Sequence, residues 1–251
     1  MSFEASGDHY DRWVGRYLPE LAPALADAAG VQPGQRAVDI GSGPGGLTRE
    51  LVARLGAENV AALDPSASFV AACRERNPGV DVHLGVAEQL PFPNRSFDVA
   101  LACLVVPFMR DAVLGVREMA RVAPVVTACV WDYGEGMQML RVFWEVAAAV
   151  DPNAPGEARL VGSSAGDLGR VFGEAGLHEI EEGALDVGAQ YEDFDDWWEP
   201  FTFGIGPAGS YCISLDDEHR AALREECRRR LGDPRAPFRA PARAWYAVGR
   251  A

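Results

Sequence analysis

The chain has 251 residues, 48% of them hydrophobic, which is enough to bury a full core as one domain or as one domain with an added cap. Its formal net charge of -14 would repel a phosphate backbone, so we expect no nucleic acid as a main partner. Residues 1–13 contain no apolar signal segment and no run reaches transmembrane length, so we expect no membrane partner and a soluble, cytoplasmic protein.

The cysteines support the same compartment. They are odd in number and widely spaced, and no pair has the C-x-x-C spacing of a zinc or redox site. We therefore expect reduced, buried thiols and no metal site. The five are Cys73, Cys103, Cys129, Cys212 and Cys227.

Residues 8–30 are predicted to form a helical lead-in ahead of the first strand, interrupted at Pro19 and Pro23. A leading helix of this kind can fold over the mouth of a ligand site. We therefore place Tyr17, or else Tyr10, against the ligand. Plain packing of these rings is the alternative.

The segment Ala37–Thr48, AVDIGSGPGGLT, predicts a strand, a glycine-rich turn and the start of a helix. Glycine lets the backbone approach a ligand closely, and a helix start presents free N–H groups. Gly41, Gly43 and Gly46 also satisfy the pattern G-x-G-x-x-G. That pattern alone is a weak indication of a nucleotide site.

Asp39 lies at the carboxyl end of this strand, where open α/β sheets bind ligands. Its carboxylate would repel the pyrophosphate of NAD or FAD, and it would attract a ligand that carries an ammonium group and a sulfonium. S-adenosylmethionine is such a ligand and contains no phosphate. The alternative is that Asp39 only accepts hydrogen bonds from the N–H groups of the glycine turn.

Residues 59–63 are predicted to form a second strand that ends in Asp64. Asp64 follows Gly43 by about twenty positions, the offset at which an acid meets a ribose diol. Two charge-assisted hydrogen bonds of about 1.5–3 kcal/mol each would hold the two hydroxyls. A solvated acid at a strand end is the alternative.

The remaining pattern alternates between strands and helices. The fourth and fifth strands are almost continuously apolar, as in a parallel sheet covered on both faces. We predict strands at 81–85, 99–106, 125–131, 177–187 and 242–249, and helices at 137–150, 165–174 and 216–231.

Four segments, VDIGSGPG, ALDPS, GVAEQLPFPNRSFDVAL and VREMARV, occur in this order between about residues 37 and 131. Together they resemble the class I S-adenosylmethionine-dependent methyltransferases, within them the small-molecule group related to the quinone-biosynthesis C-methyltransferases. The resemblance implies a Rossmann-like, doubly wound α/β fold with seven strands, the last one antiparallel, and a helical cap insertion. It implies one domain over 1–251, with a cofactor-binding core at 35–131 and a C-terminal half at 132–251 that holds the cap at about 191–232.

The resemblance also implies which residues meet the methionine part of the cofactor. Gly41 and Gly43 would approach it with their backbones. Cys103, just past the centre of the fourth strand, would lie beside the methionine chain.

The ribose and adenine contacts follow from the same resemblance. Asp64, with Pro65 beside it, would hold the ribose hydroxyls, and Ala87 and Glu88 would meet the adenine edge. Similar proteins usually carry an Asp before that Ala-Glu pair, to accept from the adenine amino group, whereas this chain has Val86. The loss of one such bond should weaken cofactor binding by about 0.5–1.5 kcal/mol without abolishing it.

By this resemblance, the protein transfers a methyl group from S-adenosylmethionine to a small-molecule acceptor. The rings and acids of 191–203 indicate a lid over the acceptor. The rings among them favour an acceptor with an apolar or aromatic body: Trp197, Trp198, Phe201 and Phe203. The alternative is that these rings form only the core of the cap.

No residue can be assigned a catalytic role from the sequence. Other readings are a catalytically inactive S-adenosylmethionine-binding protein, acting as a regulator or partner subunit, and an NAD-dependent dehydrogenase, which Asp39 disfavours. His9 could reach the site from the lead-in. Further conceivable bases are Asp132, Tyr133, Asp195, Asp196 and Glu199.

Overall fold

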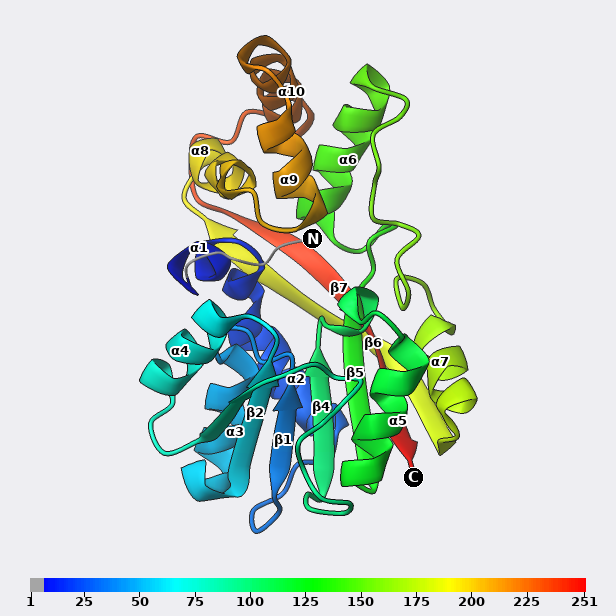
Figure 1. Cartoon of the computed structure of the whole chain (residues 1–251). Coiled ribbons are helices and arrows are strands. Elements are labelled where there is room, and N and C mark those ends of the chain that lie inside the picture. The colour runs from blue at the N-terminus through cyan, green and yellow to red at the C-terminus, as the bar shows by residue number, and fades with distance from the viewer. Residues whose placement is uncertain (1–6) are drawn as a thin grey trace.

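The computed structural model describes residues 7–251 of the chain (Figure 1). Residues 1–6 lie outside the described part, and the expectation that the N-terminus lacks a signal segment falls partly on them. Within residues 7–251, no helix combines the length and the apolar character that crossing a bilayer requires.

A seven-stranded sheet, in the order β3-β2-β1-β4-β5-β7-β6, forms the centre of the described chain. The pairs from β3 to β5 are parallel, whereas β7 runs antiparallel to both β5 and β6. This confirms the predicted doubly wound sheet with an antiparallel last strand. The strands are β1 Ala37–Ile40, β2 Val60–Asp64, β3 Asp81–Leu84, β4 Val99–Cys103, β5 Val125–Trp131, β6 His178–Tyr191 and β7 Phe238–Arg250.

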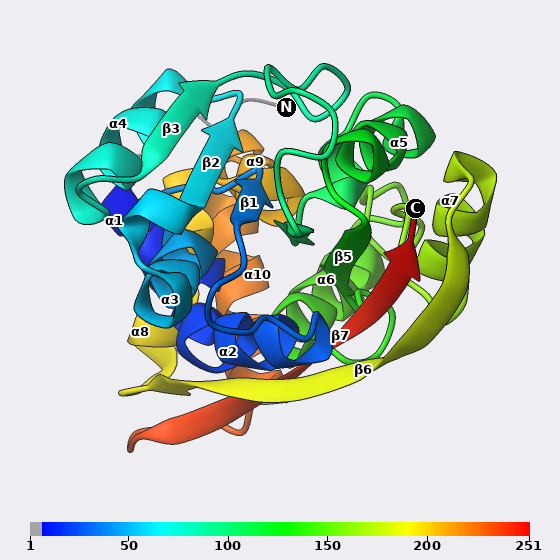
Figure 2. The same ribbon diagram turned by 90° about the horizontal axis from the view of Figure 1, so that it is seen from below.

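Helices cover both faces of this sheet. Figure 2 shows α2, α3 and α4 on one side and α5 and α7 on the other. The central strands β1, β2 and β4 are therefore buried along their whole length. The helices are α1 Gly7–Arg12, α2 Leu18–Ala28, α3 Gly46–Leu55, α4 Ala67–Arg76, α5 Ala112–Val122, α6 Gln138–Val150, α7 Asp167–Ala175, α8 Phe194–Trp198, α9 Gly206–Ser214 and α10 Asp217–Arg230, with short 3-10 turns η1 Val14–Tyr17, η2 Ala57–Asn59, η3 Val106–Phe108 and η4 Glu199–Phe203.

Side-chain caps fix where several of these helices begin. The side chains of Ser66, Asp111, Asp193 and Asp216 each accept a hydrogen bond from the backbone N–H three residues ahead. Each cap satisfies one N–H that has no partner within its helix. The Ser66 cap matters most for the site described below, because it starts α4 directly after the end of β2.

The last two strands are longer than the sequence pattern predicts. Beyond Trp131, where β5 ends opposite Ala244, strands β6 and β7 continue as a pair that reaches Tyr191 opposite Phe238. Their extra length comes from pairing between segments about fifty residues apart, a constraint that local composition does not show. This two-stranded ribbon leads out of the sheet and carries the cap between its ends (Figure 1).

The lead-in differs from the prediction in the role of its prolines. Helix α2 runs without a break from Leu18 to Ala28, so the predicted interruptions at Pro19 and Pro23 are wrong. Pro19 lies in the first turn of the helix, where its missing N–H leaves no intrahelical bond unmade. The change of direction comes earlier, at the 3-10 turn η1 that separates α1 from α2.

Four helices, α6, α8, α9 and α10, with the turn η4, pack together as the cap at the far end of the ribbon (Figure 1). Aromatic rings fill its interior: Phe201 stacks on Phe143 at 4.4 Å and receives the edge of Trp13 at 4.7 Å. Trp197 and Phe201 are fully buried. These rings therefore pack against one another and against the lead-in, the alternative that the sequence left open.

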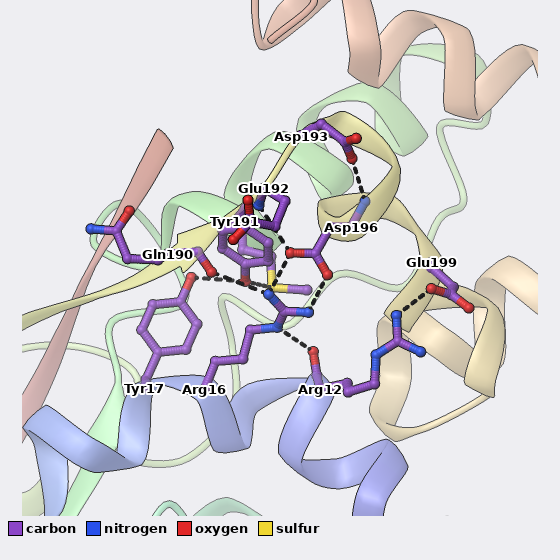
Figure 3. A network of polar contacts seen from close by, with 10 residues as sticks. Arg12, Arg16, Tyr17, Gln190, Tyr191, Glu192, Asp193, Asp196 and Glu199 are labelled. Carbon is purple, nitrogen blue, oxygen red and sulfur yellow. Dashed lines mark hydrogen bonds and ion pairs between the residues drawn. The ribbon is translucent and has the colours of Figure 1, made fainter. Parts of the chain in front are cut away.

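A charged contact ties the lead-in to this cap (Figure 3). Arg16 donates from Nη1 to Asp196 Oδ2 at 2.7 Å and from Nη2 to Asp196 Oδ1 at 2.5 Å. The guanidinium also lies over the ring of Tyr191, whose hydroxyl is 3.3 Å from that of Tyr17. Because the two charged side chains are only 17% and 22% exposed, this bidentate pair should contribute more than a surface ion pair.

We predict that Asp196→Asn lowers the free energy of unfolding by about 1–2 kcal/mol at pH 7, because it removes a partly buried charge-assisted pair. The hydrogen bond from Arg16 lowers the pKa of Asp196 below 3.8. The contribution is therefore complete above pH 3.8 and is lost as the pH falls through the lowered pKa. Urea unfolding at pH 7 and at stepwise lower pH measures both effects.

Glu199→Gln is the matched control, because the Arg12–Glu199 pair joins the same two segments but is 43% and 51% exposed. Its effect should stay below about 0.5 kcal/mol. Equal losses from the two variants would contradict a special role for the Arg16–Asp196 pair.

Candidate functional site

The turn between β1 and α3 has a backbone conformation and close contacts that favour glycine over residues with a side chain. Gly41 has φ +71°, and a Cβ there would lie 2.4 Å from Val105 Cγ2. Gly43 has φ +52°, and a Cβ there would point toward Tyr10, with the nearest ring atom 3.8 Å away. Both glycines line a cavity. The missing side chain at Gly43 leaves space for a ligand against the backbone, whereas at Gly41 it lets Val105 pack against the turn.

Asp64 ends β2 beside this turn and lines the same cavity, as does Pro65. Its Oδ2 accepts from the Gly43 N–H and its Oδ1 from the Ser66 N–H, both at 2.8 Å. Burial raises the pKa of Asp64, and these two donors offset part of the shift. Each carboxylate oxygen keeps a second lone pair, so Asp64 can accept two hydroxyl groups of a ligand.

Asp39 lies beneath the turn, fully buried, and does not line the cavity. The hydroxyl of Thr48 donates to its Oδ2 at 2.7 Å, so its partner is a side chain of α3 and not a glycine N–H. Its Oδ1 is buried and has no hydrogen-bond partner among the described residues. Burial, reinforced by the charge of Asp64, raises the pKa of Asp39 from 3.8 to about 7.

The loop after β3 brings Val86, Ala87 and Glu88 to the cavity wall. Val86 is 38% exposed, an unusual state for a large apolar side chain. Glu88 Oε1 accepts from the backbone N–H of Arg110 at 2.6 Å and of Asp111 at 3.2 Å. Glu88 thus fixes this loop to the start of α5.

Strand β4 ends at Cys103, three residues before the predicted end. Leu104 has φ +65°, a left-handed conformation that breaks the strand, although its N–H still donates to the Cys129 carbonyl at 2.9 Å. The bend turns Cys103, Leu104 and Val105 toward the cavity. The neighbouring Cys129 thiol, 3.7 Å away, and burial both raise the pKa of Cys103.

Segments outside the cofactor core close the cavity from the other side. The lead-in contributes Tyr10, Trp13 and Val14, and the start of α9 contributes residues 205–207. The structure places Tyr10, not Tyr17, at this wall. Tyr17 is fully buried, and its ring meets the edge of Trp131 with the centroids 5.4 Å apart.

The lining residues that were not assigned to the site from the sequence include Tyr133, Leu140 and Glu157. Tyr133 appeared only among the conceivable bases, and Glu157 comes from an irregular loop with no periodicity to mark it as buried. Leu140 lies on the apolar face of α6, where the pattern indicates core packing.

The other conceivable bases lie elsewhere. The ring of His9 stacks on Phe203, with centroids 4.3 Å apart, and does not line the cavity. Asp195, Asp196 and Glu199 form ion pairs with arginines outside it. Among residues 7–251, no group of three or more His, Cys, Asp or Glu side chains is arranged to hold a metal ion.

Comparison with known proteins adds independent evidence. Residues 38–124 match the family described as a methyltransferase domain. The malonyl-acyl-carrier-protein O-methyltransferase of Halorhodospira halophila is 29% identical over 199 residues, which cover 74% of this chain and 59% of that protein. The ubiquinone/menaquinone biosynthesis C-methyltransferase of Stenotrophomonas maltophilia is 35% identical over 104 residues, 39% of this chain and 41% of that protein.

The matches therefore span less than two thirds of the length of these relatives. The fold is similar over nearly the whole chain to the crystal structure of a type II methyltransferase from Anaeromyxobacter dehalogenans. That similarity covers 99% of this chain and 98% of the other, with a TM-score of 0.69 and 22% identity. Sequence similarity thus identifies a methyltransferase domain at residues 38–124, and similarity to a solved structure extends the same fold over nearly the whole chain.

Proposed function

We propose that the protein binds S-adenosylmethionine in this cavity and transfers its methyl group to a small-molecule acceptor. One observation carries the proposal: a single cavity gathers the glycine turn, Asp64, the Ala87–Glu88 loop and Cys103 from four separate strand ends. The sequence motifs select the same residues. Their convergence at the carboxyl edge of the sheet is where ligands of doubly wound folds bind.

The residues present fit this cofactor. The backbone of Gly43 leaves room for the methionine chain, with Cys103 at the end of the neighbouring strand β4. Asp64, held by two backbone donors, offers its free lone pairs to the ribose diol. The apolar side chains of Val86 and Met109 continue the wall where the adenine ring would lie.

Charge supports an adenosyl sulfonium over a dinucleotide. Negative charge is already unfavourable beneath the turn, because Asp39 and Asp64 are both buried there. The charge of Asp64 also raises the pKa of Asp39. A pyrophosphate would add two more negative charges there. An ammonium group and a sulfonium would instead offset the buried acids. This disfavours the dehydrogenase alternative.

For methyl transfer, the main task of the protein is to position the donor and the acceptor. The sulfonium supplies a methyl group that is already activated for displacement. The protein's own residues hold donor and acceptor in line, and Trp13, Leu140 and Ile205 keep water out of the space between them. This division of roles suits a cavity with apolar walls and few polar groups.

We propose an acceptor with an apolar or aromatic body. The residues that support this proposal differ from those that the sequence indicated. The rings of Trp197, Trp198 and Phe201 do not line the cavity. Trp13 and Trp131 line it instead. Flat apolar walls of this kind favour a ring or a hydrocarbon chain over a charged acceptor.

A cytoplasmic location stays a prediction. All five cysteines are buried as free thiols, which supports a reducing compartment. A regulatory protein that binds the cofactor without turnover remains the second candidate, and Val86 is the observation that favours it.

Calorimetry and a transfer assay test the proposed function together. We expect S-adenosylmethionine and S-adenosylhomocysteine to bind and NADH not to bind. With a labelled methyl donor, at least one member of a panel of phenols, quinols, amines and fatty acids should become labelled. Binding without transfer to any acceptor would favour the regulatory protein, and NADH binding would favour the dehydrogenase.

We predict that Asp64→Ala weakens binding of both adenosyl ligands by at least about 100-fold, because two charge-assisted hydrogen bonds are lost. Asp98→Ala is the matched control, since Asp98 also accepts from a backbone N–H, that of Arg36, but lies outside the cavity. Calorimetry compares the two variants. Retained affinity in Asp64→Ala would remove the ribose role.

We predict that Val86→Asp tightens S-adenosylmethionine binding by about 2- to 10-fold, because a new acceptor would meet the adenine amino group. Leu84→Asp, which adds the same charge at a 59% exposed position outside the cavity, should change little. Titration calorimetry gives both affinities. No gain at position 86 would argue against the adenine placement.

A further inference from the structure

Glu157 is a buried acid at the cavity wall, outside the part of the chain that matches the methyltransferase domain. Its residue is only 4% exposed. It belongs to the irregular segment 151–166 between α6 and α7, which descends from the cap beside the sheet (Figure 1). Acids are seldom buried to this extent without a partner or a function.

One oxygen of the Glu157 carboxyl accepts a hydrogen bond within the protein, and the other can accept one from a bound group. The indole N–H of Trp144, on α6, donates to Glu157 Oε2 at 2.6 Å. Among the described residues, no hydrogen bond reaches Oε1. The Trp144 bond thus orients the carboxyl and leaves one oxygen for a group in the cavity.

Two other hydroxyl groups share this cavity. Tyr133, 7% exposed, follows β5, and Tyr10 comes from α1. Burial, then the charge of Glu157, then Tyr10 raise the pKa of Tyr133, so Tyr133 lies within electrostatic range of both Glu157 and Tyr10. Both phenols stay protonated near neutral pH, since burial raises the pKa of each. Glu157 is the member of this set that can accept a proton.

Building on the proposed function, we propose that Glu157 is the general base of the acceptor site and removes the proton from a phenolic or enolic hydroxyl as it is methylated. The O–H electron pair stays on the acceptor oxygen, which forms the new C–O bond while the C–S bond of the donor breaks. The proton passes to Glu157 Oε1 and later to solvent. The products are the methyl ether and S-adenosylhomocysteine.

The environment of Glu157 suits this role. Burial raises its pKa from 4.5 to about 7, and the Trp144 hydrogen bond offsets part of the shift. No charged side chain contributes to the shift, and the titratable group that interacts with Glu157 is Tyr133. A base whose pKa lies near the working pH is both available and strong enough to take a phenol proton.

Glu157→Gln tests the proposal, because the amide keeps the shape and can still accept from Trp144. With the phenol that the wild-type protein methylates best, we expect kcat to fall at least about 100-fold. The affinity for S-adenosylmethionine should stay within about twofold. In the wild type, kcat should rise with pH to a plateau above about 7, because the base must be ionised, and this rise should disappear in the variant.

Trp144→Phe is the second variant, and it decides the matter if Glu157→Gln does not fold. It removes the donor that lowers the pKa of Glu157, so the midpoint of the rise should move to higher pH by about 0.5–1 unit. A purely structural Glu157 would leave that midpoint where it is.

The remaining outcomes separate this proposal from the proposed function. Unchanged kcat and an unchanged pH profile in Glu157→Gln, with an active wild type, would overturn only the role of Glu157. Cofactor binding with no phenol methylated would overturn the hydroxyl acceptor. A wild type that does not bind S-adenosylmethionine would overturn the proposed function itself.

Discussion

The hydrogen bonds between the end of β2 and the glycine turn shape one side of the cavity. Three consecutive N–H groups of the glycine turn are held there: those of Gly41 and Ser42 donate to the Leu63 carbonyl at 2.7 and 3.0 Å, and that of Gly43 donates to Asp64. The turn can take its left-handed form only because these donors are satisfied. Asp64 therefore both shapes the turn and lines the cavity.

Buried acids set the electrostatics of the same region. The pKa values of Asp39 and Glu157 both rise to about 7, because burial disfavours the charged form. Between pH 3.8 and about 7, the folded protein therefore keeps a proton on Asp39 that the unfolded chain releases. The contribution of Asp39 to stability is complete below pH 3.8 and is lost as the pH rises to about 7.

The sequence could predict site residues that follow strands at fixed spacing, but not those that depend on contacts formed only in the folded chain. Gly41, Asp64 and Glu88 follow apolar strands at short, fixed offsets, so parallel pairing alone brings them to one edge. Tyr10 and Tyr17 could not be separated, because the choice depends on the 3-10 turn between α1 and α2. The rings of 197–203 were expected at the acceptor, but their contacts with Phe143 and the lead-in arise only in the folded cap.

The same contrast separates the two sides of the cavity. The matched segment 38–124 provides the strand ends that form one side, at the carboxyl edge of the sheet. The groups that would meet the acceptor, Tyr10, Tyr133 and Glu157, come from the lead-in and from irregular segments after β5 and α6. Such segments tolerate change because few backbone hydrogen bonds depend on them. This side of the cavity is thus built from tertiary contacts of the cap and lead-in, where a linear pattern carries least information.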